Sequence, residues 1–495
     1  MASLQNYPGS RLLESLGPYT TLNVDQLNFV AAQFFALGLA ALYRTVFRPE
    51  KVSPSIRHAF GLLFGLWMGY FCFGYHAVHL AGLPAVCYLV ILTQNPQVVH
   101  GAVLFVAMLY LSCVHLHRQC FADSSYGLDI SGPLMVITQK VSSLAFSLHD
   151  GLVKRERDMT PSQKLYAIKK VPSLLEFFSY SMMFPSLMAG PVIFYNDYIA
   201  FIEGGMCAGT KKPPLDAKRV ILRDPSPARA VFRKVCAAVV CALVFVLFLP
   251  TFPISKIKEG PFVDDTSLGY KLWYLTAATA VVRAKYYFAW CLADAACNNA
   301  GLGFSGYSPD GTPLWDRFSN VDIVGFECGT SLKESIDSWN KGTNRWLRFL
   351  VYDRVSSRAT LLTFALSAIW HGFYPGYYLT FLGGALFTFA SRTVRRRVRD
   401  HFAASRESKL FYDTSTFVAT RLVMAYVTYP FVLLEFWPSV VLYNKLGWFL
   451  HGVAAALVAF GPRLIPKYED AGRKNEIAMV LRRAGPYSDA VGRID

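Results

Sequence analysis

Residues 331–382 of the chain read SLKESIDSWN KGTNRWLRFL VYDRVSSRAT LLTFALSAIW HGFYPGYYLT FL. This stretch opens with a polar segment that ends at Trp339 and Asn340. About thirty residues later it enters a long apolar run that holds a single histidine, His371. An ionisable group in the hydrocarbon region of a membrane is costly and marks a functional site by default. The pattern predicts that the rest of the chain holds His371 inside a membrane.

The composition of the chain is that of a membrane protein. Of its 495 residues, 53% are hydrophobic, 15% are aromatic and only 17% are charged, and the mean hydropathy is +0.31. The apolar residues gather in blocks comparable to the roughly 17–25 residues with which a helix crosses a bilayer. These features exclude an ordinary soluble enzyme and predict a polytopic membrane protein. Residues 1–26 show no cleavable signal peptide, so insertion is expected to start at the first internal span.

The charged residues lie mostly between the apolar blocks. Much of the formal charge of +16 falls in basic clusters at residues 44–51, 154–170, 211–234, 392–399 and 463–483. Such clusters beside spans mark cytoplasmic loops and contact anionic headgroups, which indicates a lipid bilayer as partner and argues against nucleic acid. The ten cysteines show no CxxC pair and no histidine at metal-ligand spacing. No metal and no bound cofactor is therefore expected.

Apolar periodicity predicts an all-α bundle of about eleven spans over residues 27–462. A polar segment (residues 1–26) precedes it and a basic cytoplasmic tail (residues 463–495) follows. The predicted runs cover residues 27–43, 59–92 (two spans), 98–114, 129–151, 172–198, 235–249, 268–282, 285–304, 361–391 (split after His371), 414–434 and 438–460. Nothing in the sequence indicates the oligomeric state.

Two of these runs are polar or broken. Residues 129–151 carry polar and charged side chains, and residues 172–198 carry Glu176 and are broken at Pro185 and at Gly190. Such helices are tolerated at membrane depth where they are buried in protein or line a water-filled cavity. Glu176 either lines such a cavity or sits at the membrane interface.

A third polar feature is a stripe within residues 285–304. Tyr287, Cys291, Asp294 and Asn298 follow one another at spacings of four, three and four, so on a helix they share one face. The stripe should face the interior of the bundle. It either lines a substrate tunnel or forms interhelical hydrogen bonds that lock the packing.

Asn340 and His371 carry the chemistry. A neutral imidazole can accept a proton from a hydroxyl as a general base, whereas a purely structural histidine would bond a backbone carbonyl or Ser367, one turn earlier. The Asn340 amide can orient a hydroxyl or stabilise an oxyanion. No G-x-S-x-G elbow occurs in the chain, so direct transfer onto a bound hydroxyl is favoured over a covalent serine mechanism.

The chain resembles the membrane-bound O-acyltransferase family, whose hallmark is such an Asn and His pair. Segments that resemble its lysophospholipid acyltransferase branch include DQLNFV, FCFGYHAVH, DISGPLMVITQKVSSLAFSLHDG, PSLLEFFSY, KYYFAWCLADAACNNAGLGFSGY and YPGYYLTFL. The likeness covers residues 20 to 460. One departure follows Asn340, where Lys341 to Arg345 replace a more apolar stretch of the near relatives.

The resemblance implies transfer of an acyl chain from acyl-CoA to the free hydroxyl of a lysophospholipid, in the endoplasmic reticulum membrane. It implies that His371 is the base and that Asn340 positions the acceptor or the thioester. It also implies a bundle of about eleven spans around a central tunnel, which CoA enters from the cytosol and the lysolipid from the bilayer. Lysophosphatidylethanolamine or lysophosphatidylserine is the expected acceptor, and oleoyl-CoA the expected donor.

The expected substrates suggest further binding residues. CoA phosphates need a basic tunnel mouth, for which the candidates are Arg283, Lys285, Lys341 and Arg345, each otherwise a snorkelling interfacial cation. The acyl chain needs a dry slot, for which the candidates are Trp339, Trp370, Tyr286 and Tyr287, each otherwise a packing residue. Asp294 and Asn298, which belong to the polar stripe, are further candidate substrate-binding residues.

Other functions fit parts of the sequence. The same fold could act on lysophosphatidylcholine, a sterol, diacylglycerol or a secreted peptide, although the segments near Pro172 and Lys285 argue against the last three. A transporter could have a pore lined by Glu176, Asp294 and His371. Inverted repeats in the sequence would favour this interpretation, and none is found. A lipid-binding pseudoenzyme is disfavoured by the intact Asn and His.

Overall fold

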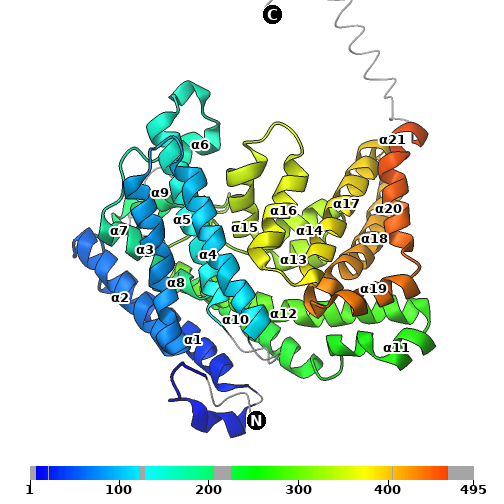
Figure 1. Cartoon of the computed structure of the whole chain (residues 1–495), viewed down its shortest axis with the longest axis horizontal. Helices are drawn as coiled ribbons and strands as arrows, with labels where there is room; N and C mark the ends of the chain where they lie inside the picture. The colour runs from blue at the N-terminus through cyan, green and yellow to red at the C-terminus, as the bar shows by residue number, and fades with distance from the viewer. Residues whose placement is uncertain (1–6, 21, 122–128, 206–224, 404, 466–495) are drawn as a thin grey trace, which may run out of the picture.

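The described part of the chain is mostly helical, with one short β-ribbon (Figure 1). The computed structural model describes residues 7–20, 22–121, 129–205, 225–403 and 405–465. The predicted all-α class is confirmed over these ranges. The basic cluster at residues 211–234 and the tail from residue 463 lie largely outside the described residues.

The helices of the N-terminal half are α1 (Val24–Thr45), α2 (Pro54–Phe73), α3 (Val78–Thr93), α4 (Val99–Phe121), α5 (Ser131–Val153), α6 (Pro161–Tyr166), α7 (Leu174–Met182), α8 (Phe184–Leu187) and α9 (Tyr195–Ile202). The 3₁₀ turns η2 (Glu14–Tyr19), η3 (Gly74–Ala77) and η4 (Glu156–Asp158) lie among them.

The C-terminal half contains α10 (Ala228–Phe248), α11 (Gly260–Asp265), α12 (Leu268–Ala300), α13 (Ile323–Glu327), α14 (Leu332–Ser338), α15 (Lys341–Leu347), α16 (Ala359–His371), α17 (Pro375–Val398), α18 (Arg406–Leu433), α19 (Phe436–Lys445), α20 (Phe449–Ala459) and α21 (Gly461–Leu464). Between them lie the 3₁₀ turns η6 (Ile254–Lys258) and η8 (Arg399–Phe402) and the π-helical turn η7 (Arg348–Tyr352). The strands β1 (Gly306–Tyr307) and β2 (Pro313–Leu314) pair antiparallel, with Gly306 opposite Leu314.

Five described helical segments are long and apolar enough to cross a membrane, and the bent pair of α19 and α20 would make a sixth. The five are α1, the segment of α2 and α3, α4, α10 and α18. Among the remaining helices, α5 carries Gln139 and Lys140, yet most of its residues are buried. The predicted count of about eleven spans stays a prediction.

The helix breaks predicted within residues 59–92 and 172–198 are confirmed. The first falls at Gly74 (φ 54°), which ends α2, and residues 172–198 divide into α7, α8 and the start of α9. Glu176 lies in the first turn of α7, where its carboxylate accepts from the Ser173 amide (2.7 Å) in a capping box. Glu176 therefore caps a helix and is not among the residues that line the cavity described below.

One prediction about spans is wrong. Residues 268–300 form one continuous helix, α12, in place of the two spans predicted for residues 268–282 and 285–304. Arg283 pairs with Glu327 of α13, and the Lys285 ammonium lies over the Tyr286 ring, so neither charge ends the helix. The run predicted as a span at residues 438–460 is bent. It consists of α19 and α20, which meet at 81° around Gly447 (φ 65°).

Two hydrophobic cores flank the middle of the molecule. One is built mainly from α1–α9 and the other mainly from α17–α20, and α12 contributes to both: Ala296 and Cys297 pack in the first, Tyr274 and Leu275 in the second. In Figure 1, α13–α16 lie between these two groups of helices. The stretch that carries Asn340 and His371 is thereby placed between the cores.

Candidate active site

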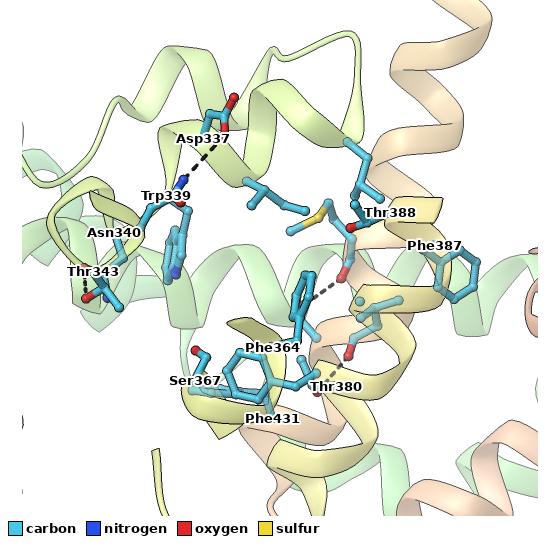
Figure 2. A pocket seen from close by; sticks show the side chains of 18 of the residues that line it. Asp337, Trp339, Asn340, Thr343, Phe364, Ser367, Thr380, Phe387, Thr388 and Phe431 are labelled. Carbon is cyan, nitrogen blue, oxygen red and sulfur yellow. Dashed lines mark hydrogen bonds between the residues drawn. The ribbon is translucent and has the colours of Figure 1, made fainter. Parts of the chain in front are cut away.

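Asn340 and His371 line the same cavity. It has a volume of about 430 Å³, and its walls come from α12 to α18. Asn340 enters at the junction of α14 and α15, and His371 is the last residue of α16. Figure 2 shows Asn340 and Thr343 on one side, with Ser367 on α16 and Phe431 on α18 on another. The two residues singled out in the sequence thus line one cavity.

Asn340 occupies a strained backbone position. Its φ is 43° in the left-handed region, which Asn tolerates better than most residues. It is the N-cap residue of α15, but its side chain caps no backbone amide. Asn320 caps the helix instead, since its backbone oxygen accepts from the Lys341 amide (2.7 Å) and its Oδ1 from the Gly342 amide (3.0 Å). A Cβ at Gly342 would lie 2.9 Å from that Oδ1, so this approach needs glycine.

His371 lies in an aromatic cage at a helix end. Its ring centroid is 5.1 Å from that of Phe381, 5.0 Å from that of Phe431 and 5.7 Å from that of Tyr377. Among the described residues no hydrogen bond joins His371 to Ser367 or to a backbone carbonyl, as a structural histidine would require. Gly372 (φ 114°) turns the chain out of α16, and Pro375 opens α17, where its missing amide costs nothing.

His115 of α4 holds the end of α16 that carries His371. Its Nε2 lies 3.1 Å from the backbone oxygen of Trp370, and a Cβ at Gly372 would lie 3.1 Å from its ring. His115 is not among the site residues predicted from the sequence. Its contact bridges 255 positions, so no local signal could have revealed it.

The profile of the MBOAT family, the membrane-bound O-acyltransferases, matches residues 97–430. The chain belongs to this family. It is 51% identical to lysophospholipid acyltransferase 6 of Drosophila melanogaster over 465 residues, which make up 93% of this chain and 64% of the fly protein. The chain therefore spans slightly less than two thirds of that relative's length.

Two vertebrate relatives are matched over most of their length. The chain is 41% identical to membrane-bound glycerophospholipid O-acyltransferase 1 of Mus musculus over 457 residues, 92% of this chain and 93% of the mouse protein. It is 40% identical to membrane-bound glycerophospholipid O-acyltransferase 2 of Gallus gallus over 453 residues, 91% of this chain and 87% of the chicken protein. The resemblance noted in the sequence is confirmed, and the chain is a multi-pass membrane O-acyltransferase.

Two of the predicted acyl-slot residues line the cavity of this acyltransferase: Trp339 and Tyr286. The Trp339 ring lies 5.9 Å from that of Tyr286, 4.9 Å from that of Trp290 and 5.1 Å from that of Phe326. Trp370 is not among the lining residues. Its Nε1 donates to the backbone oxygen of Met135 (3.1 Å), so it ties α16 to α5.

Arg283 lines the cavity but is held by an acid. Its guanidinium donates two hydrogen bonds of 2.8 Å to the Glu327 carboxylate, to which the Tyr287 hydroxyl also donates (2.7 Å). Burial alone would raise the pKa of Glu327, but the hydrogen bonds and the charges of Arg283 and Arg421 hold it below its usual range. Tyr287 and Arg283 are therefore engaged with α13.

The predicted polar stripe on α12 binds a lysine of α10. Lys234 Nζ lies 2.6 Å from Asp294 Oδ2 and 2.8 Å from Asn298 Oδ1, and it also donates to the backbone oxygen of Trp315 and to Ser319 Oγ. Neither Asp294 nor Asn298 is among the residues that line the cavity. Of the two roles considered for the stripe, these contacts favour the locking of helix packing.

The remaining predicted cations lie outside the cavity lining. Lys285 packs over the Tyr286 ring (5.1 Å), and Arg345 donates to the backbone oxygen of Arg317 (3.2 Å). Lys341 follows Asn340 in the first turn of α15. Among the described residues, no group of three or more His, Cys, Asp or Glu side chains is placed to hold a metal ion.

Three other cations line the cavity: Lys333, Arg348 and Arg392. Arg392 Nη1 donates to Thr360 Oγ1 (3.0 Å) at the start of α16, at the opposite end of that helix from His371. Arg392 opens the basic run 392–399, which the sequence pattern assigned to a cytoplasmic end. Its place in the cavity wall depends on the pairing of α16 with α17, which the run itself does not encode.

Proposed function

We propose that the chain transfers an acyl group from acyl-CoA to the free hydroxyl of a lysophospholipid, with His371 as general base and Asn340 as the residue that positions a substrate. The observation that carries the proposal is that Asn340 and His371, from separate elements, line one cavity. The names of the relatives, which concern lysophospholipids and glycerophospholipids, support the class of acceptor.

The geometry supports a direct transfer. His371 has no acidic partner among the described residues and sits in an apolar aromatic cage, which suits a neutral imidazole that takes the proton of the acceptor hydroxyl. The hydroxyl oxygen forms a bond to the thioester carbon, and collapse of the intermediate breaks the C–S bond. His371 returns the proton to the departing CoA thiolate, so no cofactor is consumed.

The charge distribution of the cavity supports CoA as the carrier of the acyl group. Arg392 and Thr360 lie at one end of α16 and His371 at the other, eleven residues apart and hence roughly 16 Å along the helix axis. Arg348 adds positive charge to the lining, where phosphates of CoA would be attracted, whereas Lys333 is paired with Asp337 of the same lining. The thioester would then reach His371 through the apolar part of the cavity.

The finer assignments rest on the likeness to the lysophospholipid acyltransferase branch. We propose lysophosphatidylethanolamine or lysophosphatidylserine as the acceptor, oleoyl-CoA as the donor and the endoplasmic reticulum as the membrane. The product is a diacyl phospholipid, so the reaction belongs to phospholipid remodelling.

The test is acyl transfer in membranes that contain wild type, His371→Ala or Asn340→Ala at equal abundance. The donor is labelled oleoyl-CoA, and the acceptors are lysophospholipids that differ only in headgroup. We expect wild type to acylate the ethanolamine or serine lysolipid and both variants to lose at least about 100-fold of the rate, as is typical when a catalytic group is removed. Equal rates for wild type and His371→Ala on every lysolipid would refute the proposal.

A further inference from the structure

The Asn340 side chain is free of the capping contact that its position would ordinarily require. An N-cap Asn usually accepts a hydrogen bond from a backbone amide of the first helical turn. In this chain Asn320 supplies that acceptor to the Gly342 amide, and Asn340 caps nothing. The fold thus uses a second asparagine, twenty positions earlier, to leave the Asn340 amide available to the cavity.

A hydrogen-bond chain from α5 reaches that amide. Gln139 Nε2 donates to Thr343 Oγ1 (2.8 Å), and Thr343 Oγ1 donates to Asn340 Oδ1 (2.8 Å). Gln139 is 1% exposed and Thr343 is 6% exposed, so bulk water competes little for these bonds. Gln139 lies on α5, most of whose residues are buried and several of which belong to the first hydrophobic core.

The direction of this chain decides what Asn340 offers a substrate. Because Oδ1 accepts from Thr343, the Nδ2 amino group remains, and within the described part of the chain it donates no hydrogen bond. Asn340 and Thr343 both line the cavity, as Figure 2 shows. The Asn340 Nδ2 group, with two hydrogens to donate, is therefore available to the cavity in which the acyl group must react, while Thr343 binds the Oδ1 of the same amide.

We propose that Gln139 and Thr343 are positioning residues that fix the Asn340 amide so that Nδ2 donates to the carbonyl oxygen of the acyl thioester. This inference rests on the proposed acyl transfer and specifies the part of it that Asn340 performs. As the acceptor oxygen adds to the thioester carbon, the C=O electron pair moves to oxygen, and Nδ2–H stabilises the resulting oxyanion. The pair returns when the C–S bond breaks.

The first arm of the test separates donation from acceptance at Asn340. Asn340→Asp keeps an oxygen that can accept from Thr343 but replaces the amino group with a second oxygen. We expect its kcat to fall by at least about 100-fold, as for Asn340→Ala, because an oxyanion donor is lost. If Asn340→Asp kept most of the wild-type kcat, Asn340 would act as an acceptor, and the proposal would be wrong.

The second arm tests the relay. Thr343→Val removes the hydroxyl at nearly constant volume, and Gln139→Leu removes the amide. Each should lower kcat by roughly 10- to 100-fold, because a small misplacement of a reacting group has effects of that size. The KM values for oleoyl-CoA and the lysolipid should change less than about twofold. Thr343→Ser keeps the hydroxyl and should retain most of the wild-type rate. The matched control is Thr416→Val, because the Thr416 hydroxyl donates within its own helix, to the Tyr412 backbone oxygen (2.9 Å).

A double-mutant cycle shows whether the two residues act in series. If Gln139 acts through Thr343, adding Gln139→Leu to Thr343→Val should cause no further loss of kcat. Losses that simply multiply, or that disappear when rates are corrected for folded protein, would overturn the relay. The parallel His371→Ala variant separates the two claims: an inactive His371→Ala beside a fully active Thr343→Val would remove the relay and leave the acyltransferase assignment standing.

Discussion

The two residues at the centre of the site both lie where a helix ends or begins. Asn340 adopts φ 43° before α15, and His371 precedes Gly372 at φ 114°. Each is supported from outside its own helix, by Asn320 in one case and by His115 on α4 in the other. Unusual backbone geometry of this kind persists where surrounding structure enforces it, and it gathers at functional sites.

Gly372 is the residue at which this support can be tested. In Gly372→Ala the new Cβ would approach the His115 ring to 3.1 Å in a backbone conformation that L-residues rarely adopt. We expect displacement of His371 and at least a tenfold loss of acyl transfer, with a strain cost of about 1–3 kcal/mol in stability.

The matched control is Gly452→Ala on α20, where a Cβ would meet no atom within 4 Å. Activity and thermal stability of both variants are measured in the same membranes. Wild-type activity in Gly372→Ala would contradict the role given to this turn.

The sequence indicated the candidate pair Asn340 and His371 but not the groups that contact them. Asn340 and His371 stood out because a polar side chain in an apolar setting is visible locally. Gln139 and Thr343 meet across 204 positions, and their pairing depends on how α5 packs beside α15. No periodicity or spacing encodes such a contact, so only the assembled structure reveals it.

At the scale of elements, α12 shows how charges are tolerated inside a long buried helix. The sequence pattern predicted a boundary between two spans at residues 283–284, where α12 continues without a break. The partners that satisfy charges on α12 come from other elements: Glu327 from α13 for Arg283, and Lys234 from α10 for Asp294. The breaks at Gly74 and Gly372 were predictable because glycine and proline act locally.

The Lys234 contact makes a prediction about the role of Asp294. Lys234→Met would leave the Asp294 carboxylate, 4% exposed, without its countercharge, which destabilises by about 3–5 kcal/mol. The double variant Lys234→Met with Asp294→Asn should recover most of that stability, because no unpaired charge remains. Stability is read from the temperature at which solubilised protein loses its monodisperse chromatographic peak.

Activity per folded molecule then distinguishes the two roles considered for Asp294. If Asp294 only locks α12 to α10, the double variant keeps acyl transfer close to that of wild type. A stable but inactive double variant would instead assign Asp294 to substrate binding.

In the whole molecule, the two hydrophobic cores lie on either side of the elements that line the cavity. Helices, breaks and the reactive pair were predictable from the sequence, while the count of spans and the cations of the cavity depend on packing that no local pattern reveals. The fold combines an aromatic cage around His371, a fixed amide at Asn340 and positive charge at Arg348 and Arg392 in one lining. The central claim is that one bound acyl-CoA molecule contacts all three of these features.

The most direct test is a cryo-electron microscopy structure of the full chain in lipid nanodiscs with a non-reactive thioether analogue of oleoyl-CoA. We predict that the phosphates lie beside Arg392 and Arg348 and that the atoms replacing the thioester lie between Asn340 Nδ2 and the His371 ring. An analogue bound with its thioether outside this cavity, for example beside Lys234 and Asp294, would contradict the central claim.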